Sequence, residues 1–581
     1  MAKVRSYKAQ KVLDRLGKKL NRQMVGSLVA CVHCGMCTQA CHYVLTNPGD
    51  PTYAPAWKAD RLRKIFKRHF DWTGRVFPWW VGAKSIWTDE ELEELKDIVF
   101  GKCTNCRRCS INCPMGVDFA TYNRMTRGLL VSVGIMPEGV AVVSKDQWEI
   151  GNQMGVLKED YLETLEWMAD ELRNELDDPT IEIPIDKMNA DVVYSINPRE
   201  VKYDPRTIAD AAKIFHFAGE NWTMPSEGWD MTNFGLFSGD DDLGASVASL
   251  LYDKVEELKG KKLVISECGH GYRSTRCEGQ NWAQQDVNFV MESSVITMLR
   301  YIHEGKIKVD KTRNTIPVTF HDSCNNARSC GLFEEPRDLL NLVVTDFREM
   351  YPNRTENYCC TGGGGAMSMS EYTPKRLKSA KVKADQLKAT GAKIVVTSCH
   401  NCVDGLTDLI RHYKLDMEVS QLVNLVANAL VIPEKKVKIP VEIPVEEVEI
   451  GDGHLLKGRK ILIVDDEPDI LTFFASVLED NGATVLVAAD GDTAIRLARE
   501  EKPDAITLDL NMPEKDGGQV FEELRNDPET AGIKVCIITG RPELRRLIYG
   551  RAVPPPEGYL DKPVDEITLL RNIRKIIELA D

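Results

Sequence analysis

Two runs of cysteines have the residue type and the spacing of iron–sulfur ligands. Each run reads C-x2-C-x2-C-x3-C, and the cysteines are Cys31, Cys34, Cys37 and Cys41, then Cys103, Cys106, Cys109 and Cys113. Three thiolates at this spacing reach adjacent irons of one [4Fe–4S] cubane, and the fourth ligates the other cluster. Structural zinc also uses C-x2-C pairs, but a run of four that occurs twice favours iron–sulfur clusters. We therefore predict two electron-carrying cubanes, held by Cys31, Cys34, Cys37 and Cys113, and by Cys103, Cys106, Cys109 and Cys41.

A second group of cysteines stands farther along the chain at wider intervals. It comprises Cys324, the adjacent Cys359 and Cys360, and the pair Cys399 and Cys402, with a run of glycines over 362–365. Adjacent cysteines can hardly both bind one tetrahedral zinc without strain, but they can bind two irons of a larger cluster. Glycines beside them let backbone N–H groups approach the sulfurs, which tunes the redox potential. This group therefore predicts another iron–sulfur site.

These five cysteines resemble the cysteine-rich CCG domain of heterodisulfide reductase subunits. The resemblance implies that Cys324, Cys359, Cys360, Cys399 and Cys402 hold one non-cubane [4Fe–4S] cluster, which would be the catalytic centre. The chain departs from the family pattern in two places. It has Thr361 after the double cysteine, where the family has glycine, and it has His321-Asp322-Ser323 before Cys324, where the family usually has a proline and a second histidine.

An internal repeat surrounds this group. Short apolar runs over 263–266, 316–320 and 394–397 each end just before a cysteine, as expected for buried parallel strands, whose carboxyl ends gather ligands. The segment 262–271 aligns with 393–402, which matches Cys268 to Cys399 and puts Gly271 where Cys402 stands in the second copy. We infer a duplicated α/β domain whose first half has lost its metal site.

The remaining thiols and three histidines have several possible roles. Cys268 could lie near the cluster or be a buried structural thiol. Cys330 is interpreted as a spare thiol, and Cys277 and Cys536 as structural ones. The histidines that flank cysteines are His270, His321 and His400. They could relay protons, although a hydrogen-bonded structural histidine is the commoner case.

Acidic residues follow predicted strands in the last part of the chain. Asp465 and Asp466 follow a strand over 460–464, and Asp509 follows a strand over 505–508. Three carboxylates at strand ends bind Mg2+, which offsets their mutual repulsion, and Asp509 could then accept a phosphoryl group. The residues that would respond are Thr539, which senses the phosphate, Tyr559, a candidate rotamer switch, and Lys562, which pairs with the phosphate. This segment resembles response-regulator receiver domains, which implies a flavodoxin-like (βα)5 fold and a histidine kinase as partner.

Charge and composition indicate the cellular compartment of the protein. The formal net charge is −14, yet residues 1–70, whose first thirty we expect to form a basic amphipathic helix, are strongly basic. No apolar signal-peptide core follows the early basic residues, and no run of about eighteen apolar residues predicts a membrane span. Cysteines in such a chain indicate metal ligands in a reducing compartment. We expect a cytoplasmic protein that binds no nucleic acid, since no recognition helix is evident.

An aromatic insert separates the two cysteine runs. Its large aromatic residues are Trp57, Trp72, Phe77, Trp79, Trp80 and Trp87, and the basic residues among them include Arg61, Arg63, Lys64, Lys67 and Arg68. The insert could form a small core that covers the clusters. It could also form a docking face for a membrane partner, since tryptophan beside basic residues suits a membrane interface. Docking is the preferred interpretation.

The chain is thus predicted to be a multidomain α/β protein. The expected parts are a helical two-[4Fe–4S] ferredoxin module with the aromatic insert over 1–145, a connecting helical segment over 146–190, the duplicated CCG domain over 191–430, an extended linker over 431–457 and the receiver domain over 458–581.

Residues 1–430 together are similar to the D-type subunit of heterodisulfide reductases and to the Dsr K-, Tmc B- and Hmc F-type subunits of sulfate reducers. The segments 41–51, 231–240 and 267–273 carry this resemblance, together with the degenerate first CCG half. It implies an oxidoreductase subunit on the inner face of the cell membrane, bound to a cytochrome b or quinone-handling subunit and to a multihaem cytochrome. Electrons would pass between these partners and a disulfide-type substrate or a cytoplasmic carrier, and the phosphorylatable receiver would regulate the flow.

Two other interpretations stay open. The ferredoxin-plus-CCG plan also occurs in the iron–sulfur component of soluble glycolate or lactate oxidation, which would co-purify with a flavoprotein rather than with a haem-bearing membrane protein. A redox-sensing signalling protein would instead change the phosphorylation of Asp509 when its clusters change oxidation state.

Overall fold

The computed structural model describes residues 5–432, residues 456–539 except 514, and residues 553–578 except 555, 563 and 565. The chain divides into two compact units, one made of residues 1–201 and 205–433 and the other of residues 202–204 and 434–581. The linker predicted over 431–457 lies almost entirely outside the described residues.

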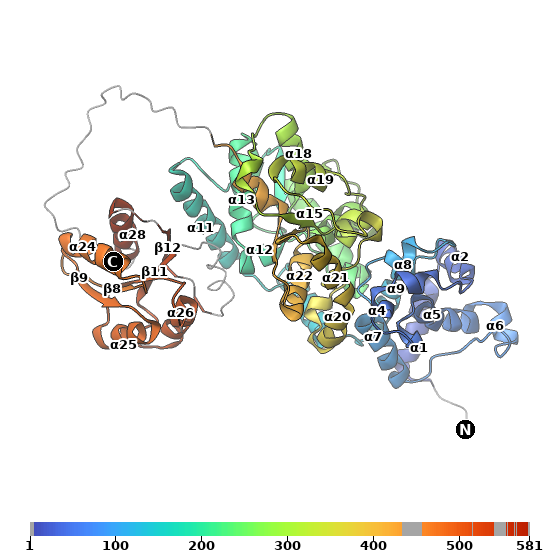
Figure 1. Cartoon of the computed structure of the whole chain (residues 1–581). Helices are drawn as coiled ribbons and strands as arrows, with labels where there is room; N and C mark the ends of the chain where they lie inside the picture. Colours follow the sequence, from blue (N-terminus) through green and yellow to red (C-terminus); the bar gives the residue numbers. More distant parts are fainter. Residues whose placement is uncertain are drawn as a thin grey trace. The chain divides into compact units, whose positions relative to one another are not determined.

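The N-terminal part of the first unit is helical (Figure 1). Its helices are α1 (Tyr7–Lys19), α2 (Arg22–Ala30), α3 (Met36–Ala40), α4 (His42–Leu45), α5 (Pro55–Phe70), α6 (Trp72–Val76), α7 (Asp89–Gly101), α8 (Arg108–Ile111), α9 (Phe119–Val131) and α10 (Glu138–Glu149). Two helices replace the single one expected over residues 1–30. The reason is Asn21, whose side chain accepts a hydrogen bond from the N–H of Met24 and so begins α2.

A long helix, α11 (Lys158–Leu176), lies within the segment expected to be a connector. Tyr161, Leu165, Met168 and Leu172 are buried along one side of it and join the largest hydrophobic core of the chain. Tyr161 also stacks on Trp229, with ring centroids 4.2 Å apart. The helix is therefore an integral part of the CCG region's core rather than a free spacer.

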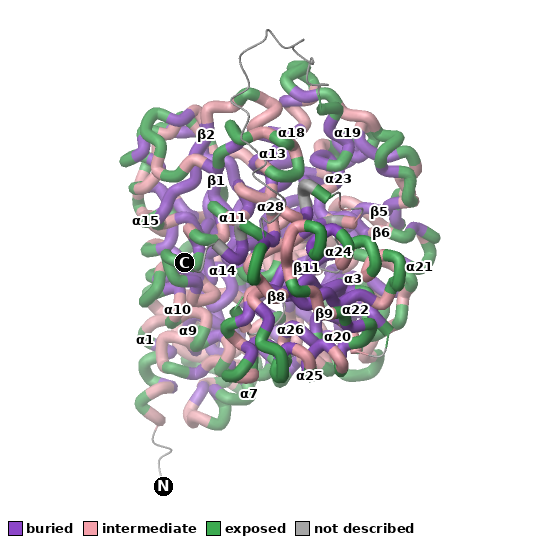
Figure 2. The backbone as a smooth tube through the Cα atoms, turned by 90° about the vertical axis from the view of Figure 1, so that its left-hand side faces the viewer, coloured by how far each residue is buried: buried purple, intermediate pink, exposed green. Residues whose placement is uncertain are grey.

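Two parallel sheets follow, one in each half of the predicted duplication. The first has the order β2-β1-β3-β4, and the second has the order β5-β6-β7. Their strands are β1 (Val192–Ser195), β2 (Trp222–Thr223), β3 (Lys262–Ile265), β4 (Val290–Ser293), β5 (Val318–Phe320), β6 (Ile394–Val396) and β7 (Glu418–Ser420). The strands of the aligned segments, β3 and β6, lie inside their respective sheets, and β1, β5 and β6 are mostly buried (Figure 2).

Helices and two π-helical turns connect these strands. The helices are α12 (Pro198–Tyr203), α13 (Arg206–Phe217), α14 (Gly235–Ser238), α15 (Asp241–Glu257), α16 (Gly269–Arg273), α17 (Gln280–Ala283), α18 (Ser294–His303), α19 (Glu335–Val343), α20 (Thr373–Ser379), α21 (Lys381–Thr390), α22 (His400–Tyr413) and α23 (Leu422–Ala429). The π-helical turns are η2 (Ser274–Gly279) and η4 (Cys324–Ser329). In both halves a helix begins right after the cysteine that follows the inner strand, the short α16 after Cys268 and the longer α22 after Cys399.

The second unit has the expected flavodoxin-like order. Its parallel strands are β8 (Lys460–Val464), β9 (Thr484–Ala488), β10 (Ala505–Leu508), β11 (Lys534–Thr539) and β12 (Gly558–Asp561), arranged β12-β11-β10-β8-β9. Two separate apolar layers cover the two faces of this sheet. The described helices are α24 (Pro468–Asp480), α25 (Gly491–Glu501), α26 (Gly517–Asn526) and α28 (Glu566–Glu578). The carboxyl ends of β8, β10 and β11 therefore meet at one edge.

Candidate metal centres and phosphorylation site

One cavity in the first unit is lined by four of the predicted ligands. They are Cys41, Cys103, Cys106 and Cys109, with His42 and Tyr43 beside them. Burial raises the pKa of the Cys109 thiol, and the neighbouring Cys41, Cys106 and Cys103 raise it further. The fourth cysteine of the first run thus lies among the first three of the second run, as the crossed assignment requires.

The complementary set is seen around Cys37. Burial raises the pKa of this thiol, and Cys31 and Cys113 both lie close enough to raise it further. Cys34, the remaining member of the predicted set, is exposed.

The two cysteine loops share one unusual backbone pattern. His33 and Asn105, each just before the second cysteine of its run, have φ near +55°, at 55° and 54°. Gly35 and Arg107, each just after that cysteine, are also left-handed, with φ of 83° and 65°. Such turns aim successive N–H groups into a concave site that suits anionic sulfur, and the N–H of Asn105 donates to Cys103 Sγ at 3.4 Å. Two distant segments thus form equivalent cradles.

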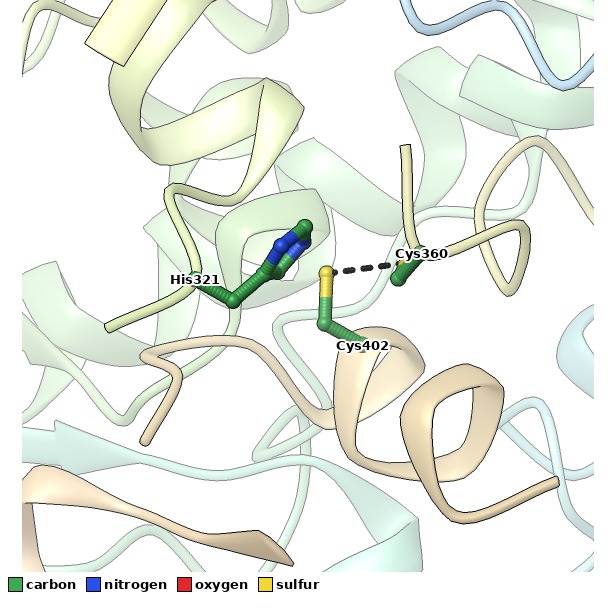
Figure 3. Close-up of side chains that lie close together, drawn as sticks. All are labelled: His321, Cys360 and Cys402. Carbon is green, nitrogen blue, oxygen red and sulfur yellow. Dashed lines mark hydrogen bonds between the residues drawn. The ribbon is translucent and has the colours of Figure 1, made fainter. Parts of the chain in front are cut away.

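The five CCG cysteines also come together. Cys360 Sγ and Cys402 Sγ are 3.2 Å apart, and His321 lies beside them (Figure 3). Cys399 lies within hydrogen-bond reach of Cys402. Burial raises the pKa of the Cys324 thiol, and the nearby Cys359 and Cys360 raise it further. All but Cys324 are buried. A dense set of buried thiols of this kind fits a cluster and excludes water from it.

Backbone N–H groups support the double cysteine. Thr361 N donates to Cys359 Sγ at 3.2 Å, and Gly362 N donates to Cys360 Sγ at 3.4 Å. Thr361 has a φ of 69°, a region that disfavours β-branched residues and favours glycine. A glycine, which the resemblance implies at this position, would adopt this conformation without strain, and this chain adopts it with a threonine.

His321 is a polar neighbour of the CCG thiols whose role the sequence left open. Its ring nitrogen, Cys360 Sγ and Cys402 Sγ lie within 4.8 Å of one another. The side-chain amide of Asn357 lies 3.2 Å from His321 Nδ1, and burial keeps the pKa of this imidazole well below its usual value. A neutral imidazole at this place fits a ligand or a hydrogen-bond partner of the site. The wide sequence separation of its neighbours concealed this arrangement.

The cubane loop and the CCG site are in direct contact. Thr104 Oγ1 lies 3.4 Å from Cys359 Sγ, and Cys106 and Cys359 act on each other's pKa through a side-chain hydrogen bond. Gly364 is pressed against the same loop, because a Cβ there would come within 2.4 Å of the Thr104 carbonyl oxygen. The loops that carry the two predicted metal sites therefore pack directly against each other.

Arg127 of α9 links the segments that form this contact. It is fully buried and donates to four backbone carbonyls, those of Val99 (2.9 Å), Phe237 (2.9 Å), Gly364 (2.6 Å) and Cys103 (2.7 Å). Burial lowers the pKa of the guanidinium to about 10, which leaves it charged at neutral pH. One side chain thus ties the ferredoxin-like loop to both halves of the CCG region.

Replacing Arg127 by methionine should lower the free energy of unfolding of the first unit by about 3 kcal/mol, because it leaves several buried carbonyls without donors. Urea unfolding followed by circular dichroism measures the change. Arg15→Met is the matched control, since its ion pair with Asp242 (3.3 Å) is exposed and should be worth less than about 1 kcal/mol. Equal losses in the two variants would contradict the fastening role.

The first half of the duplication has no room for a second site of the same kind. Cys268 Sγ accepts hydrogen bonds from Gly271 N at 3.3 Å and from Asn197 Nδ2 at 3.5 Å. A Cβ at Gly271, the position that aligns with Cys402, would lie 2.2 Å from Met231 Sδ. Met231 therefore fills the space that a ligand would need, and Cys268 is a buried thiol that lies near Cys399.

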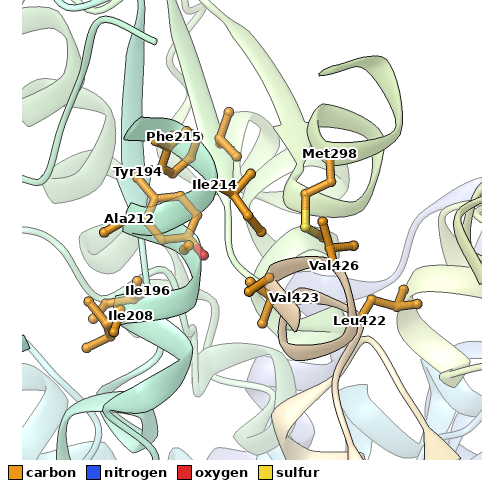
Figure 4. Close-up of a cluster of buried hydrophobic side chains, with 14 of the residues drawn as sticks. Tyr194, Ile196, Ile208, Ala212, Ile214, Phe215, Met298, Leu422, Val423 and Val426 are labelled. Atoms are coloured by element: carbon orange, nitrogen blue, oxygen red, sulfur yellow. The ribbon is translucent and has the colours of Figure 1, made fainter. Parts of the chain in front are cut away.

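Buried acids connect the two halves. Glu200 Oε1 pairs with His400 Nε2 at 2.8 Å and accepts from Ser266 Oγ at 2.5 Å. Burial would raise the pKa of Glu200, but the ion pair with His400 and the hydrogen bond from Ser266 hold this pKa below its usual value. Glu267 accepts from the N–H groups that begin α23, Leu422 at 2.9 Å and Val423 at 2.6 Å, and both of those residues pack into the apolar core (Figure 4).

The free energy of unfolding should depend on pH through Glu267. Burial raises the pKa of Glu267 to about 8, whereas the unfolded side chain titrates near 4.5. Between these values the folded state keeps a proton that the unfolded state has lost, so stability should fall by about 1.4 kcal/mol per pH unit as the pH rises. Glu267→Gln should remove this contribution and make the pH dependence shallower by about 1.4 kcal/mol per pH unit in urea unfolding between about pH 5.5 and 7.5. Parallel profiles of the two proteins would contradict the assignment.

The acidic side chains predicted to hold Mg2+ lie together in the second unit. Carboxylate oxygens of Asp465, Asp466 and Asp509 lie within 4.8 Å of one another, and Asp465 and Asp509 are buried. Lys562 Nζ lies 2.7 Å from both Asp465 Oδ2 and Asp509 Oδ2. Burial raises the pKa of Asp465, and Lys562 offsets part of that rise. Three oxygen ligands of this type fit Mg2+.

The predicted switch residues lie on neighbouring strands. Thr539 is fully buried at the end of β11, and Tyr559 of β12 pairs in register with Ile537. Tyr559 is half-buried against the apolar layer that contains Leu508. Thr539 thus lies on the strand next to the one that Asp509 follows, and Tyr559 lies one strand farther out.

The aromatic insert divides into two groups. Arg61 lies over the ring of Trp57 at 4.1 Å, and Arg5 lies over the ring of Trp87 at 4.5 Å. Trp72, Trp79 and Trp80 are instead 71%, 77% and 77% exposed around α6 and the turn after it. We call these three tryptophans the exposed aromatic knob.

Cys277, interpreted as structural from the sequence, is also exposed.

Comparison with known proteins finds three matching domains. Residues 27–117 match the 4Fe-4S dicluster domain, residues 318–406 the cysteine-rich domain and residues 461–574 the response regulator receiver domain. The Hdr-like menaquinol oxidoreductase iron-sulfur subunit 2 of Archaeoglobus fulgidus is 27% identical over 460 residues, which cover 71% of this chain and 81% of the relative. The D-type subunit of the dihydromethanophenazine:CoB--CoM heterodisulfide reductase of Methanosarcina barkeri is 27% identical over 418 residues, 71% of this chain and 96% of the relative.

The second unit has its own relatives. Protein PilH of Pseudomonas aeruginosa is 39% identical over 118 residues, which cover 20% of this chain and 97% of the relative. The fold and the matched domains define an iron–sulfur electron-transfer subunit of an oxidoreductase, joined to a receiver domain. The chain is homologous to the Hdr-like iron–sulfur subunits, and its residues 461–574 belong to the response regulator receiver domain family. Among the residues that the structure describes, no helix combines the length and the apolar character that a membrane span needs.

Proposed function

We propose that this chain is the electron-transfer and catalytic subunit of a membrane-associated redox complex that acts on a disulfide-type substrate. The observation that carries the proposal is the contact between the cubane loop and the CCG site, with Thr104 Oγ1 3.4 Å from Cys359 Sγ. A direct contact of this kind supports electron passage from one metal site to the next without an intervening carrier.

The thiols present fit three [4Fe–4S] clusters. Cys31, Cys34, Cys37 and Cys113 would hold the first cubane, and Cys103, Cys106, Cys109 and Cys41 the second. Cys324, Cys359, Cys360, Cys399 and Cys402 would hold a non-cubane cluster. When bound, these groups would supply centres that take up and release single electrons. The N–H groups of Thr361 and Gly362 would stabilise negative charge on the double cysteine.

The names of the relatives support the two ends of the electron path. One is a menaquinol oxidoreductase subunit and another a heterodisulfide reductase subunit. We therefore place a quinone-handling or cytochrome b subunit, with a multihaem cytochrome, at the ferredoxin side, as in the complexes of sulfate reducers. The disulfide substrate belongs at the CCG site. A cytoplasmic location on the inner face of the membrane follows from this placement.

The reaction can be tested on anaerobically purified protein that has been reduced by dithionite. Addition of CoB–CoM heterodisulfide should restore the oxidised absorption of the clusters, whereas glyoxylate and pyruvate should not. The Cys536→Ser variant should behave like the parent protein, because Cys536 lies on β11 of the receiver domain and is not a predicted ligand. Reoxidation by the 2-oxo acids alone would favour a hydroxy-acid oxidase component and overturn the proposal.

The exposed aromatic knob is the proposed attachment to the membrane partner. Trp72, Trp79 and Trp80 project from a segment that also carries Lys67, Arg68 and Arg75, and such a surface suits a membrane interface. Changing all three tryptophans to alanine should move most of the protein from the membrane fraction to the supernatant. Trp148→Ala, at a tryptophan that is 50% exposed elsewhere, is the control. Unchanged sedimentation of the triple variant would remove the knob from the interface.

The receiver would regulate this flow through phosphorylation. Asp509 is the proposed phosphoacceptor for a histidine kinase, Asp465 and Asp466 would complete the Mg2+ site, and Lys562 would pair with the new phosphate. Thr539 and Tyr559 are the proposed switch residues.

A further inference from the structure

Two cysteines outside the proposed ligand sets face each other in the CCG region. Cys277 is exposed and lies in the π-helical turn η2, whereas Cys330 is half-buried and follows the π-helical turn η4. Their sulfurs are 3.4 Å apart although the residues are 53 positions apart in sequence. A disulfide needs a sulfur–sulfur distance of about 2.05 Å, so the two sulfurs have to approach each other by about 1.3 Å to form the bond.

Contacts that do not involve the sulfurs hold the two turns together. Arg273, at the end of α16, donates to Asn325 Oδ1 in η4 at 3.3 Å and to Glu278 Oε1 in η2 at 3.0 Å. Cys330 also packs against the apolar core of the first half. The juxtaposition of the thiols therefore does not depend on a bond between them. Both turns are π-helical, a conformation that occurs frequently at functional sites.

We propose that Cys277 and Cys330 form a redox-active thiol pair that exchanges electrons with low-molecular-weight disulfides. This site goes beyond the proposed function, because it uses none of the clusters. The exposed Cys277 is the attacking sulfur, and the half-buried Cys330 is the resolving sulfur.

The exchange balances without another reactant. The Cys277 thiolate attacks one sulfur of a disulfide RSSR, the RS–SR bond breaks, and one RS⁻ leaves while a mixed disulfide forms on Cys277. Cys330 then loses its proton and attacks the Cys277 sulfur, which expels the second RS⁻ and forms the Cys277–Cys330 disulfide. Two thiols of the protein are oxidised, RSSR is reduced, and the two protons end on the two RSH products.

The surroundings support these roles. Either sulfur of the pair can donate the hydrogen bond, and with Cys330 as the donor the pKa of Cys277 falls to about 7; Arg276 and Arg273 add to this effect, whereas burial and Glu278 oppose it. A thiol with a pKa near the ambient pH is the best placed to attack a disulfide. The same hydrogen bond raises the pKa of Cys330, which keeps the resolving thiol protonated until Cys277 has reacted.

The test uses anaerobic, cluster-loaded full-length protein in buffers with varied ratios of glutathione disulfide to glutathione. After alkylation, trypsin releases each cysteine alone on its own peptide, Cys277 on residues 277–300 and Cys330 on residues 329–337. Mass spectrometry should find the two peptides linked at high disulfide ratios and alkylated at low ratios. In Cys330→Ser, Cys277 should carry glutathione instead. Cys536→Ser, at a fully buried thiol, should leave the linkage unchanged.

Complete alkylation of both peptides at every ratio would overturn the proposal. So would equal amounts of the glutathione adduct on Cys277 in the parent protein and in Cys330→Ser, because no resolving thiol would then be at work. Cluster absorption recorded in the same samples separates this result from a failure of the proposed function, since oxidation of the pair requires no change in the clusters.

Discussion

Replacing Cys360 by serine is expected to abolish the proposed non-cubane cluster while the two cubanes remain. Cys360 Sγ lies 3.2 Å from Cys402 Sγ and receives the N–H of Gly362, so it stands inside the thiol set rather than at its edge. Serine keeps the size of the side chain but lacks a soft thiolate ligand. The iron content should fall from about twelve to about eight per chain, and disulfide-dependent turnover should fall by at least about 100-fold.

Electron paramagnetic resonance of the oxidised and the reduced protein distinguishes the two kinds of cluster. The signal of the oxidised CCG site should disappear in Cys360→Ser, and the signals of the reduced cubanes should persist. Cys277→Ser serves as control, because this exposed thiol belongs to no proposed ligand set. A Cys360→Ser protein with full iron content and unchanged spectra would remove the five-cysteine assignment.

Replacing Asp509 by asparagine is expected to abolish phosphorylation of the receiver domain. Asp509 is buried at the end of β10, with its Oδ2 2.7 Å from Lys562 Nζ, so its carboxylate is held where a phosphoryl group would be received. Asparagine keeps the shape of the side chain but cannot form an acyl phosphate. Labelling by acetyl phosphate in the presence of Mg2+ should fall by at least about 100-fold.

Phosphate-affinity electrophoresis measures this labelling directly. Asp480→Asn, at an exposed position at the end of α24, should be labelled like the parent protein. Undiminished labelling of Asp509→Asn would place the acceptor at another residue.

Much of the candidate site could be predicted from the sequence because its chemistry is local. Three cysteines at two-residue intervals reach one cluster wherever their loop lies, and a carboxylate that follows a parallel strand must stand at the carboxyl edge of the sheet. The loss of the metal site from the first half of the duplication was also predictable, since Gly271 cannot supply a thiolate. The structure adds the reason, which is that Met231 fills the space.

The remaining features depend on residues that are distant in sequence. Arg127 donates to the carbonyl of Gly364, 237 positions away, and Glu267 accepts hydrogen bonds from the first N–H groups of α23, more than 150 positions later. Cys277 and Cys330 likewise meet only because two turns pack together. No local pattern predicts such pairs. The helix expected over residues 1–30 was wrong for a local reason, because Asn21 is a strong N-cap that divides it.

Iron and acid-labile sulfide, determined on anaerobically purified full-length protein, test the central claim most directly. Three [4Fe–4S] clusters predict about twelve irons and about twelve sulfides per chain, in a brown protein. A colourless preparation with zinc in place of iron, or with no more than about four irons, would contradict it.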